Sequence, residues 1–174
     1  MKFPTIFKSQ RLSATPIQFE DWPGLLHAVT SEQFPRELGL ASHTTEEAAK
    51  NWHLARVKDW NNNNCFVWSI RWHDKSEVIG QLSLVPREHD IALAYWVNPE
   101  LWGQGVVTEI LKSLMLTVYE SGYKGDIWAA AHSWNARSLS VLVKLGFKFQ
   151  KDSQYRSNNG KMENLKEYLL SVGK

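Results

Sequence analysis

Apolar and polar residues alternate over short stretches through much of the first half of the chain. Residues 11–18 alternate in this way and predict a first strand, and residues 65–72, 77–85 and 91–97 are runs rich in β-branched and aromatic residues. The polar link 73–77 has five residues, a length that suits a hairpin. The three later runs therefore predict an antiparallel meander.

Two stretches between the first strand and the meander have the character of helices. A first helix is expected over residues 22–30 and a longer one over residues 44–60. Thr44, followed three residues later by Glu47, predicts a capping box at the start of the longer helix, and the asparagine run 61–64 predicts its end. The expected order of the first half is thus strand, two helices and meander.

A helical periodicity begins after the meander. Val106, Ile110, Leu114 and Val118 recur every four residues, which predicts an amphipathic helix that ends near Gly122. Beyond it we expect a strand over 126–134 and then a helix over 135–146, capped by Asn135 and stopped by Gly146. A strand over 147–150 and a last strand over 165–171 follow, with a hairpin signal between them at Asn159 and Gly160. Residues 1–174 are therefore expected to form one α+β domain, with a single mixed, mostly antiparallel sheet and helices on both faces.

Charge and cysteine content narrow the function classes. Basic residues number 20 and acidic residues 18, giving a net charge of +2 without a basic block, so no nucleic-acid partner is expected. The single Cys65 forms neither an internal disulfide nor a cysteine-based metal site, which favours a reducing, cytoplasmic setting without a bound metal. No apolar stretch approaches the ~20 residues of a membrane span, so neither a membrane segment nor a secretory signal is expected.

Gly103 and Gly105 lie where a predicted strand gives way to a predicted helix. Glycine lets the backbone approach a ligand closely, and a helix start leaves N–H groups unpaired at the positive end of the helix dipole. The N–H groups from Gln104 to Thr108 are therefore candidates for an anion cradle. A plain turn is the alternative, and the pattern fits neither the dinucleotide fingerprint nor the Walker loop.

Five short motifs occur in an order that resembles one enzyme family. They are SQRL at residues 9–12, AYWVNPE at 94–100, WGQGVVTEI at 102–110, Asn135 and Ser138 followed by Gly146 and Phe147, and NG at 159–160 before Tyr168. On these motifs, which extend from about residue 9 to residue 170, the chain resembles the GCN5-related N-acetyltransferase (GNAT) superfamily and, within it, the RimJ/RimL-type branch. The resemblance implies the acyl-coenzyme A N-acyltransferase fold and acetyl-coenzyme A (acetyl-CoA) as cosubstrate.

The resemblance also implies where acetyl-CoA binds. The pantetheine arm is expected along Tyr95, Trp96 and Val97, with its far end at Asn135. Asn135 is also a plain helix N-cap, and the two roles are compatible. The pyrophosphate is expected on the glycine turn, which comprises Gly103 and the N–H groups of Gln104, Gly105, Val106, Val107 and Thr108.

Acetyl transfer from a thioester to an amine needs a neutral amine and a proton for the departing thiolate. The resemblance suggests Ser138 as the acid; a helix serine bonded backward to a carbonyl is the alternative. His132 is a candidate proton relay for the amine, and water held by backbone carbonyls is the other candidate. Ala92 replaces the glutamate base and Leu142 the tyrosine acid of many relatives. Because Cys65 has no evident base beside it, we expect direct transfer in a ternary complex without a covalent intermediate.

Three function classes stay open at this point. Tryptophans in the first half of the chain favour an apolar acceptor, so the leading hypothesis is an acetyltransferase for a protein or peptide N-terminal amine of the ribosomal-protein type. A small-molecule amine acetyltransferase, acting on an aminoglycoside or polyamine, is the enzyme alternative. A non-catalytic acyl-CoA sensing module is the third. Ala92 and Leu142, which lack the catalytic groups of relatives, motivate it together with Val107, which adds bulk where the family has glycine or alanine. A homodimer is compatible with each of them.

Overall fold

The computed structural model describes residues 3–157 and 160–173 and contains one eight-stranded sheet in the order β1-β2-β3-β4-β5-β6-β8-β7. Every neighbouring pair is antiparallel except β5 and β6, which run parallel. The expected single mixed, mostly antiparallel sheet is therefore confirmed. The strands are β1 (Phe7–Lys8), β2 (Leu12–Pro16), β3 (Phe66–Trp72), β4 (Gly80–Pro86), β5 (Asp90–Val97), β6 (Gly125–His132), β7 (Lys148–Arg156) and β8 (Met162–Val172).

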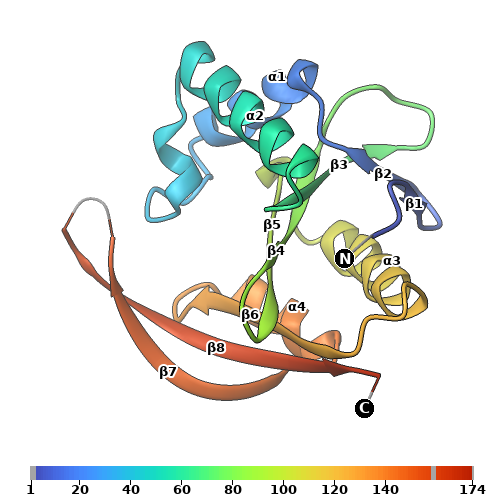
Figure 1. Cartoon of the computed structure of the whole chain (residues 1–174). Helices are drawn as coiled ribbons and strands as arrows, with labels where there is room; N and C mark the ends of the chain where they lie inside the picture. The colour runs from blue at the N-terminus through green and yellow to red at the C-terminus, as the bar shows by residue number, and fades with distance from the viewer. Residues whose placement is uncertain (1–2, 158–159, 174) are drawn as a thin grey trace.

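Helices cover both faces of this sheet. In Figure 1, α1 and α2 lie on one side of the central strands and α3 on the other, while the β7–β8 hairpin extends away from the body. In the part of the chain described, no helix has the length and apolar character needed to cross a bilayer. The α-helices are α1 (Trp22–Thr30), α2 (Glu46–Asn61), α3 (Val106–Glu120) and α4 (Ala136–Lys144), with short 3-10 turns η1 (Phe19–Asp21), η2 (Gly39–Ser42) and η3 (Pro99–Leu101).

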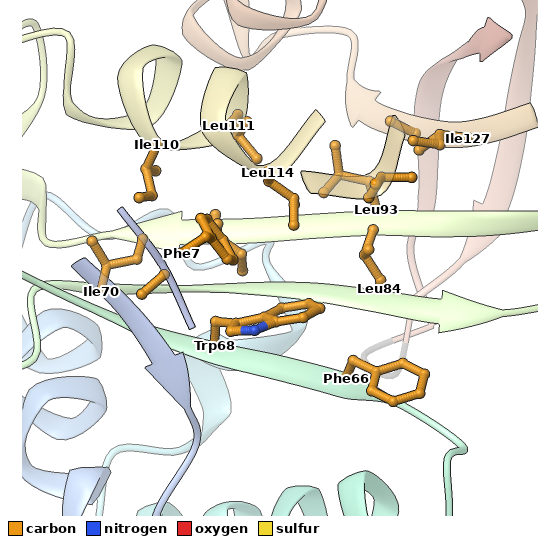
Figure 2. Packing of buried hydrophobic residues seen from close by; sticks show 14 of the residues in the cluster. Phe7, Phe66, Trp68, Ile70, Leu84, Leu93, Ile110, Leu111, Leu114 and Ile127 are labelled. Carbon is orange, nitrogen blue, oxygen red and sulfur yellow. The ribbon is translucent and has the colours of Figure 1, made fainter. Parts of the chain in front are cut away.

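The main hydrophobic core lies between α3 and the sheet. The amphipathic face expected for residues 106–122 is present, because Ile110, Leu111 and Leu114 are fully buried against strand residues (Figure 2). Strand alternation places Leu93 of β5 and Ile127 of β6 on this same face. The opposite face of β5 and β6 therefore points toward α1 and α2, and this division decides which residues reach each side of the site.

The expected elements are all present, with shifted ends. The first strand is shorter than residues 11–18 and is preceded by the short β1, which the sequence reading missed. β7 and β8 extend well beyond residues 147–150 and 165–171, because they pair with each other along their length as a hairpin. Gly160 lies at the tip of this hairpin with a positive φ, while Asn159 lies outside the described residues.

The predicted capping box at α2 is wrong by one residue. Thr45, not Thr44, is the N-cap, and its side chain accepts a hydrogen bond from the N–H of Ala48. Ala48 has no side-chain acceptor to return the bond, so Glu47 closes no box. Two adjacent threonines made the register ambiguous, and the backbone selected the second.

A row of polar side chains crosses the sheet beneath α1 and α2. Ser69 of β3, Gln81 of β4 and Trp96 of β5 lie side by side, and Gln81 donates to Ser69 and accepts from the indole of Trp96 at 3.1 Å. Asp21, which is buried, accepts from Ser69 at 2.6 Å and from the guanidinium of Arg71. Because these polar groups are paired with one another, their hydrogen bonds offset the desolvation cost of burying them, and the row holds the start of α1 against the sheet.

Replacing Asp21 by alanine should lower the free energy of unfolding by about 3 kcal/mol, because it leaves Arg71 and Ser69 without their buried acceptor. Urea unfolding checks the value. Asp152→Ala is the control, since its ion pair with Lys166 is exposed and contributes about 1 kcal/mol at most. Equal losses in the two variants would show that the buried network is not what holds α1.

Candidate active site

The sheet opens between β5 and β6. The two strands pair over only four residues each, from Asp90 with Asp126 to Leu93 with Ala129. Past that point β5 stays paired with β4 as far as Val97, while β6 stays paired with β8 as far as His132. The second halves of β5 and β6 therefore diverge, and backbone groups at the opening are free of a sheet partner.

A cavity of about 830 Å³ occupies this opening and reaches both faces of the sheet. On the α3 side it is lined by the glycine turn and by α4; on the other side it is lined by Phe34, Pro35 and Leu38 from the α1–α2 connection and by Trp128. Every residue predicted for the site lines this cavity except Gln104: Tyr95, Trp96, Val97, Gly103, Gly105, Val106, Val107, Thr108, His132, Asn135 and Ser138.

The glycine turn adopts a conformation that suits glycine. Gly103 and Gly105 have φ values of 78° and 74°, in the left-handed region, and Gly105 is the N-cap of α3. A Cβ built on Gly103 would meet nothing within 4 Å, so open space lies in front of the turn. The N–H groups of Val106, Val107 and Thr108 have no partner within the helix, and the dipole of α3 adds positive potential there. Gln104 donates its side chain to the carbonyl of Glu100 at 3.1 Å.

Ser138 lies one turn into α4 and contacts a residue of β5. Its hydroxyl is 2.7 Å from the hydroxyl of Tyr95, so the two form a hydrogen bond across the cavity. Burial raises the pKa of Tyr95 to about 12, against the lowering effect of the bond to Ser138. Asn135 is the N-cap of α4, with its side-chain oxygen accepting from the N–H of Ser138 at 3.2 Å. The backward bond to a carbonyl, the alternative for Ser138, is replaced by this Tyr95 contact.

His132 lies at the end of β6 on the opposite face of the opened sheet. Alternation along β6 puts Ile127, Ala129 and Ala131 in the α3-side core, so His132 faces the α1 and α2 side. The residue is only 6% exposed and it lines the cavity. His132 and Ser138 thus approach the same cavity from its two sides.

The profile of the acetyltransferase (GNAT) domain matches residues 11–148. The chain belongs to the GNAT family. The predicted N-acetyltransferase class and the predicted cosubstrate, acetyl-CoA, are confirmed at this level, and the match covers four of the five motifs in full or in part.

Individual relatives are distant but match along nearly the whole chain. The uncharacterised N-acetyltransferase YoaA of Bacillus subtilis is 24% identical over 164 residues, which cover 91% of each protein. RimL, a ribosomal L7/L12 α-N-protein acetyltransferase solved with coenzyme A, has a TM-score of 0.80 at 17% identity and covers 98% of this chain and 97% of that one. The microcin C7 self-immunity acetyltransferase MccE, solved with acetyl-CoA and AMP, has a TM-score of 0.83 at 16% identity and covers 94% and 93%. The predicted GNAT fold and the RimJ/RimL-type likeness are confirmed.

The residues around the turn of this GNAT chain fit a cosubstrate that carries phosphates. Arg137 of α4 stacks on Trp102 with its guanidinium 3.9 Å from the ring centroid, and both line the cavity beside Gly103. Lys144, one more cation of α4, lines the same cavity near Gly105. Open glycine backbone, a helix start and two cations line one cavity, a combination that suits phosphate oxygens.

Two of the three departures of this chain from the GNAT pattern, Leu142 and Val107, line the cavity. Leu142 is 1% exposed and belongs to the main core, so it leaves no acid at that position. Ala92 lies on β5 where the strand is still paired with β6, before the opening begins. Val107 packs partly against the core and also lines the cavity, while its N–H stays at the helix start.

A clamp beneath the glycine turn was missed by the sequence reading. Glu109 in the first turn of α3 accepts from the hydroxyl of Ser9 at 2.6 Å and from both the N–H and the Nε of Arg11 at 2.8 and 2.6 Å. Arg11 in turn donates to the carbonyl of Gln104 at 3.0 Å. These residues belong to the SQRL and WGQGVVTEI motifs. Nothing in the sequence indicates directly that the two motifs touch; it shows only that both resemble motifs of one family.

The contacts of Glu109 with Ser9 and Arg11 make the free energy of unfolding depend on pH. Burial alone would raise the pKa of Glu109, but hydrogen bonds from Ser9 and Arg11 outweigh it and hold the pKa below its usual value. A lowered pKa means that the clamp stabilises the fold above the pKa of the unfolded chain and is lost as pH falls through the folded value.

Glu109→Gln should therefore be less stable than the wild type by about 1 kcal/mol at pH 7, and the difference should shrink as pH falls below about 4. Thermal unfolding between pH 7 and pH 3.5 measures both quantities. Glu120→Gln, at the exposed end of α3, serves as the control and should show no such trend. A pH-independent difference at position 109 would contradict the clamp.

Proposed function

We propose that this GNAT protein acetylates the N-terminal α-amine of a protein or peptide, using acetyl-CoA in a direct transfer. The observation that carries the proposal is the composition of the cavity. Among its described lining residues there is no aspartate or glutamate, whereas Arg137, Lys144 and His132 are present. A polyamine or an aminoglycoside brings several positive charges, and this lining offers them no carboxylate partner.

An N-terminal amine suits the same lining better. It brings one cationic nitrogen followed by a chain that an apolar surface accommodates, and the acceptor side supplies Phe34, Leu38 and Trp96. The likeness of the fold to RimL, whose name describes an α-N-protein acetyltransferase, supports the same class. The small-molecule alternative remains for an amine with a single charge and an apolar body.

The two hydroxyls on the α4 side supply the acid function in this proposal. Burial raises the pKa of Tyr95 to about 12, so its hydroxyl carries a proton at neutral pH, and in this proposal that hydroxyl is the donor in its 2.7 Å bond with Ser138. That arrangement leaves the hydrogen of Ser138 to point at the departing sulfur of the thioester. Tyr95 then has two roles in this proposal: it lines the pantetheine channel, and it orients the hydroxyl of Ser138.

Direct transfer also agrees with the position of the only thiol. Cys65 is buried in a satellite cluster with Ile17 and Val67, away from the cavity lining. Burial raises its pKa, so it is a poor nucleophile at neutral pH. An acetyl-enzyme on Cys65 is therefore not part of the mechanism.

Ser138→Ala and Tyr95→Phe should each lower kcat by about 10²-fold or more while the Kd for acetyl-CoA changes less than threefold, because both remove a proton path and keep the channel. Steady-state assays on a peptide with a free N-terminal alanine, with isothermal titration of acetyl-CoA, measure the two constants. Tyr119→Phe, on the exposed face of α3, is the matched control. Loss of binding in step with loss of turnover would point to damaged structure instead.

Saturating acetyl-CoA should raise the unfolding midpoint. At about 100 times its Kd it adds about 2.7 kcal/mol, or roughly 5–10 °C for a chain of this size. NAD is the control and should give no shift.

A mass-spectrometric comparison then decides the acceptor class: the peptide should be acetylated at least 10²-fold more efficiently than spermidine. Binding without acetylation of any amine would favour the acyl-CoA sensing module, and preference for spermidine would favour the small-molecule alternative.

A further inference from the structure

Two aromatic rings pack against the imidazole of His132. The indole of Trp134 lies tilted by 31° to the imidazole with ring centroids 5.0 Å apart, and the ring of Tyr155 approaches edge-on at 6.0 Å. Its Nδ1 atom is buried and has no hydrogen-bond partner among the described residues. A buried imidazole nitrogen without a hydrogen bond lowers the stability of the fold, so a nearby group that interacts with this atom is to be sought.

One carboxylate lies beside that nitrogen. Glu163, on β8, places its Oε2 3.6 Å from Nδ1 of His132 and is only 8% exposed. The same carboxylate acts on Tyr155: burial and then the charge of Glu163 raise the pKa of that phenol, which keeps it protonated. Glu163 is thus an anion buried against the acceptor side of the cavity without lining the cavity itself.

We infer that Glu163 is the positioning residue for His132 as the base of the reaction. Its negative charge favours the tautomer with hydrogen on Nδ1, so that Nε2 carries the lone pair. Because Nδ1 is buried against Glu163, Nε2 is the nitrogen available to the cavity that His132 lines. The acceptor therefore arrives as an ammonium ion and gives a proton to Nε2 before it attacks. The amine acceptor in this inference rests on the proposed function. The tautomer of His132 rests only on the position of Glu163 beside Nδ1.

The protons balance across the two sides of the sheet. One of the three ammonium protons passes to Nε2 of His132 and then to solvent, and the freed lone pair forms the C–N bond as the C–S bond breaks. The thiolate takes the hydrogen of Ser138, and the second proton from nitrogen returns to Ser138 through water. The third stays on the amide. The products are an N-acetylated amine, a thiol and one released proton.

The charges that face His132 make this assignment specific. From β8 it faces Glu163 and from β7 Tyr155, while the α1–α2 connection contributes the uncharged Phe34, Pro35 and Leu38 to this side of the cavity. The cations of the lining belong to α4 on the other face of the sheet. Glu163 is accordingly the one anion that the described residues set against this imidazole.

The first test needs no substrate. In ¹⁵N-labelled protein at pH 8, NMR of the His132 ring should show hydrogen on Nδ1 and a bare Nε2, with Glu163→Gln moving the population toward hydrogen on Nε2. Hydrogen on Nε2 in the wild type would overturn the inference, whether or not the protein is an acetyltransferase.

The second test uses turnover. Glu163→Gln should lower kcat/KM for the alanine peptide at least tenfold and leave the KM for acetyl-CoA within twofold, and Glu163→Asp should recover part of the loss. Asp152→Asn, which removes an exposed carboxylate from the same hairpin, should match the wild type. Unchanged turnover in Glu163→Gln would contradict the positioning role. Absence of transfer in the wild type would instead refute the proposed function and leave the tautomer result to decide this inference.

Discussion

The short pairing between β5 and β6 is the constraint on which the rest of the site depends. Each strand is committed to a different neighbour past Leu93 and Ala129, so the sheet separates there without losing its outer pairing. Gly80 helps to hold β5 toward β4, because a Cβ at that position would lie 2.6 Å from the carbonyl oxygen of Trp96. A cavity through a sheet is possible only where backbone pairing stops, and here it stops between the two strands that carry Tyr95 and His132.

The opening separates two kinds of chemistry. On the α3 and α4 side lie the open glycine turn, the cations Arg137 and Lys144, and the hydroxyls of Ser138 and Tyr95. On the α1 and α2 side lie apolar surface and His132, backed by Glu163. In the reaction that we propose, phosphate binding and sulfur protonation belong to the first side and amine deprotonation to the second. In this account the thioester carbonyl is attacked at the level of the sheet, where both sides meet.

Much of the fold was predictable because it rests on local patterns. The period of α3 and the β-rich runs gave the elements, and the glycine turn was recognisable from its position between them. The contacts Tyr95–Ser138, Arg11–Glu109 and His132–Glu163 were not predictable, since each joins segments far apart in the chain. Spacing along the sequence carries no information about such pairs; the register of the sheet and the docking of α4 decide them. The extra length of β7 and β8 was not predicted for the same reason, because the exposed β7 has no apolar alternation and is held by its pairing with β8.

The most direct measurement is a backbone-amide NMR titration of the protein with acetyl-CoA, followed by addition of the alanine peptide to the coenzyme A complex. The account predicts that acetyl-CoA perturbs the amides of residues 103–108, the part of β5 past Leu93 and the start of α4, and that the peptide then perturbs His132 and the α1–α2 connection around Phe34. Both ligands shifting the same side of the sheet, or acetyl-CoA leaving the glycine turn unchanged, would contradict a transfer through the opening between β5 and β6.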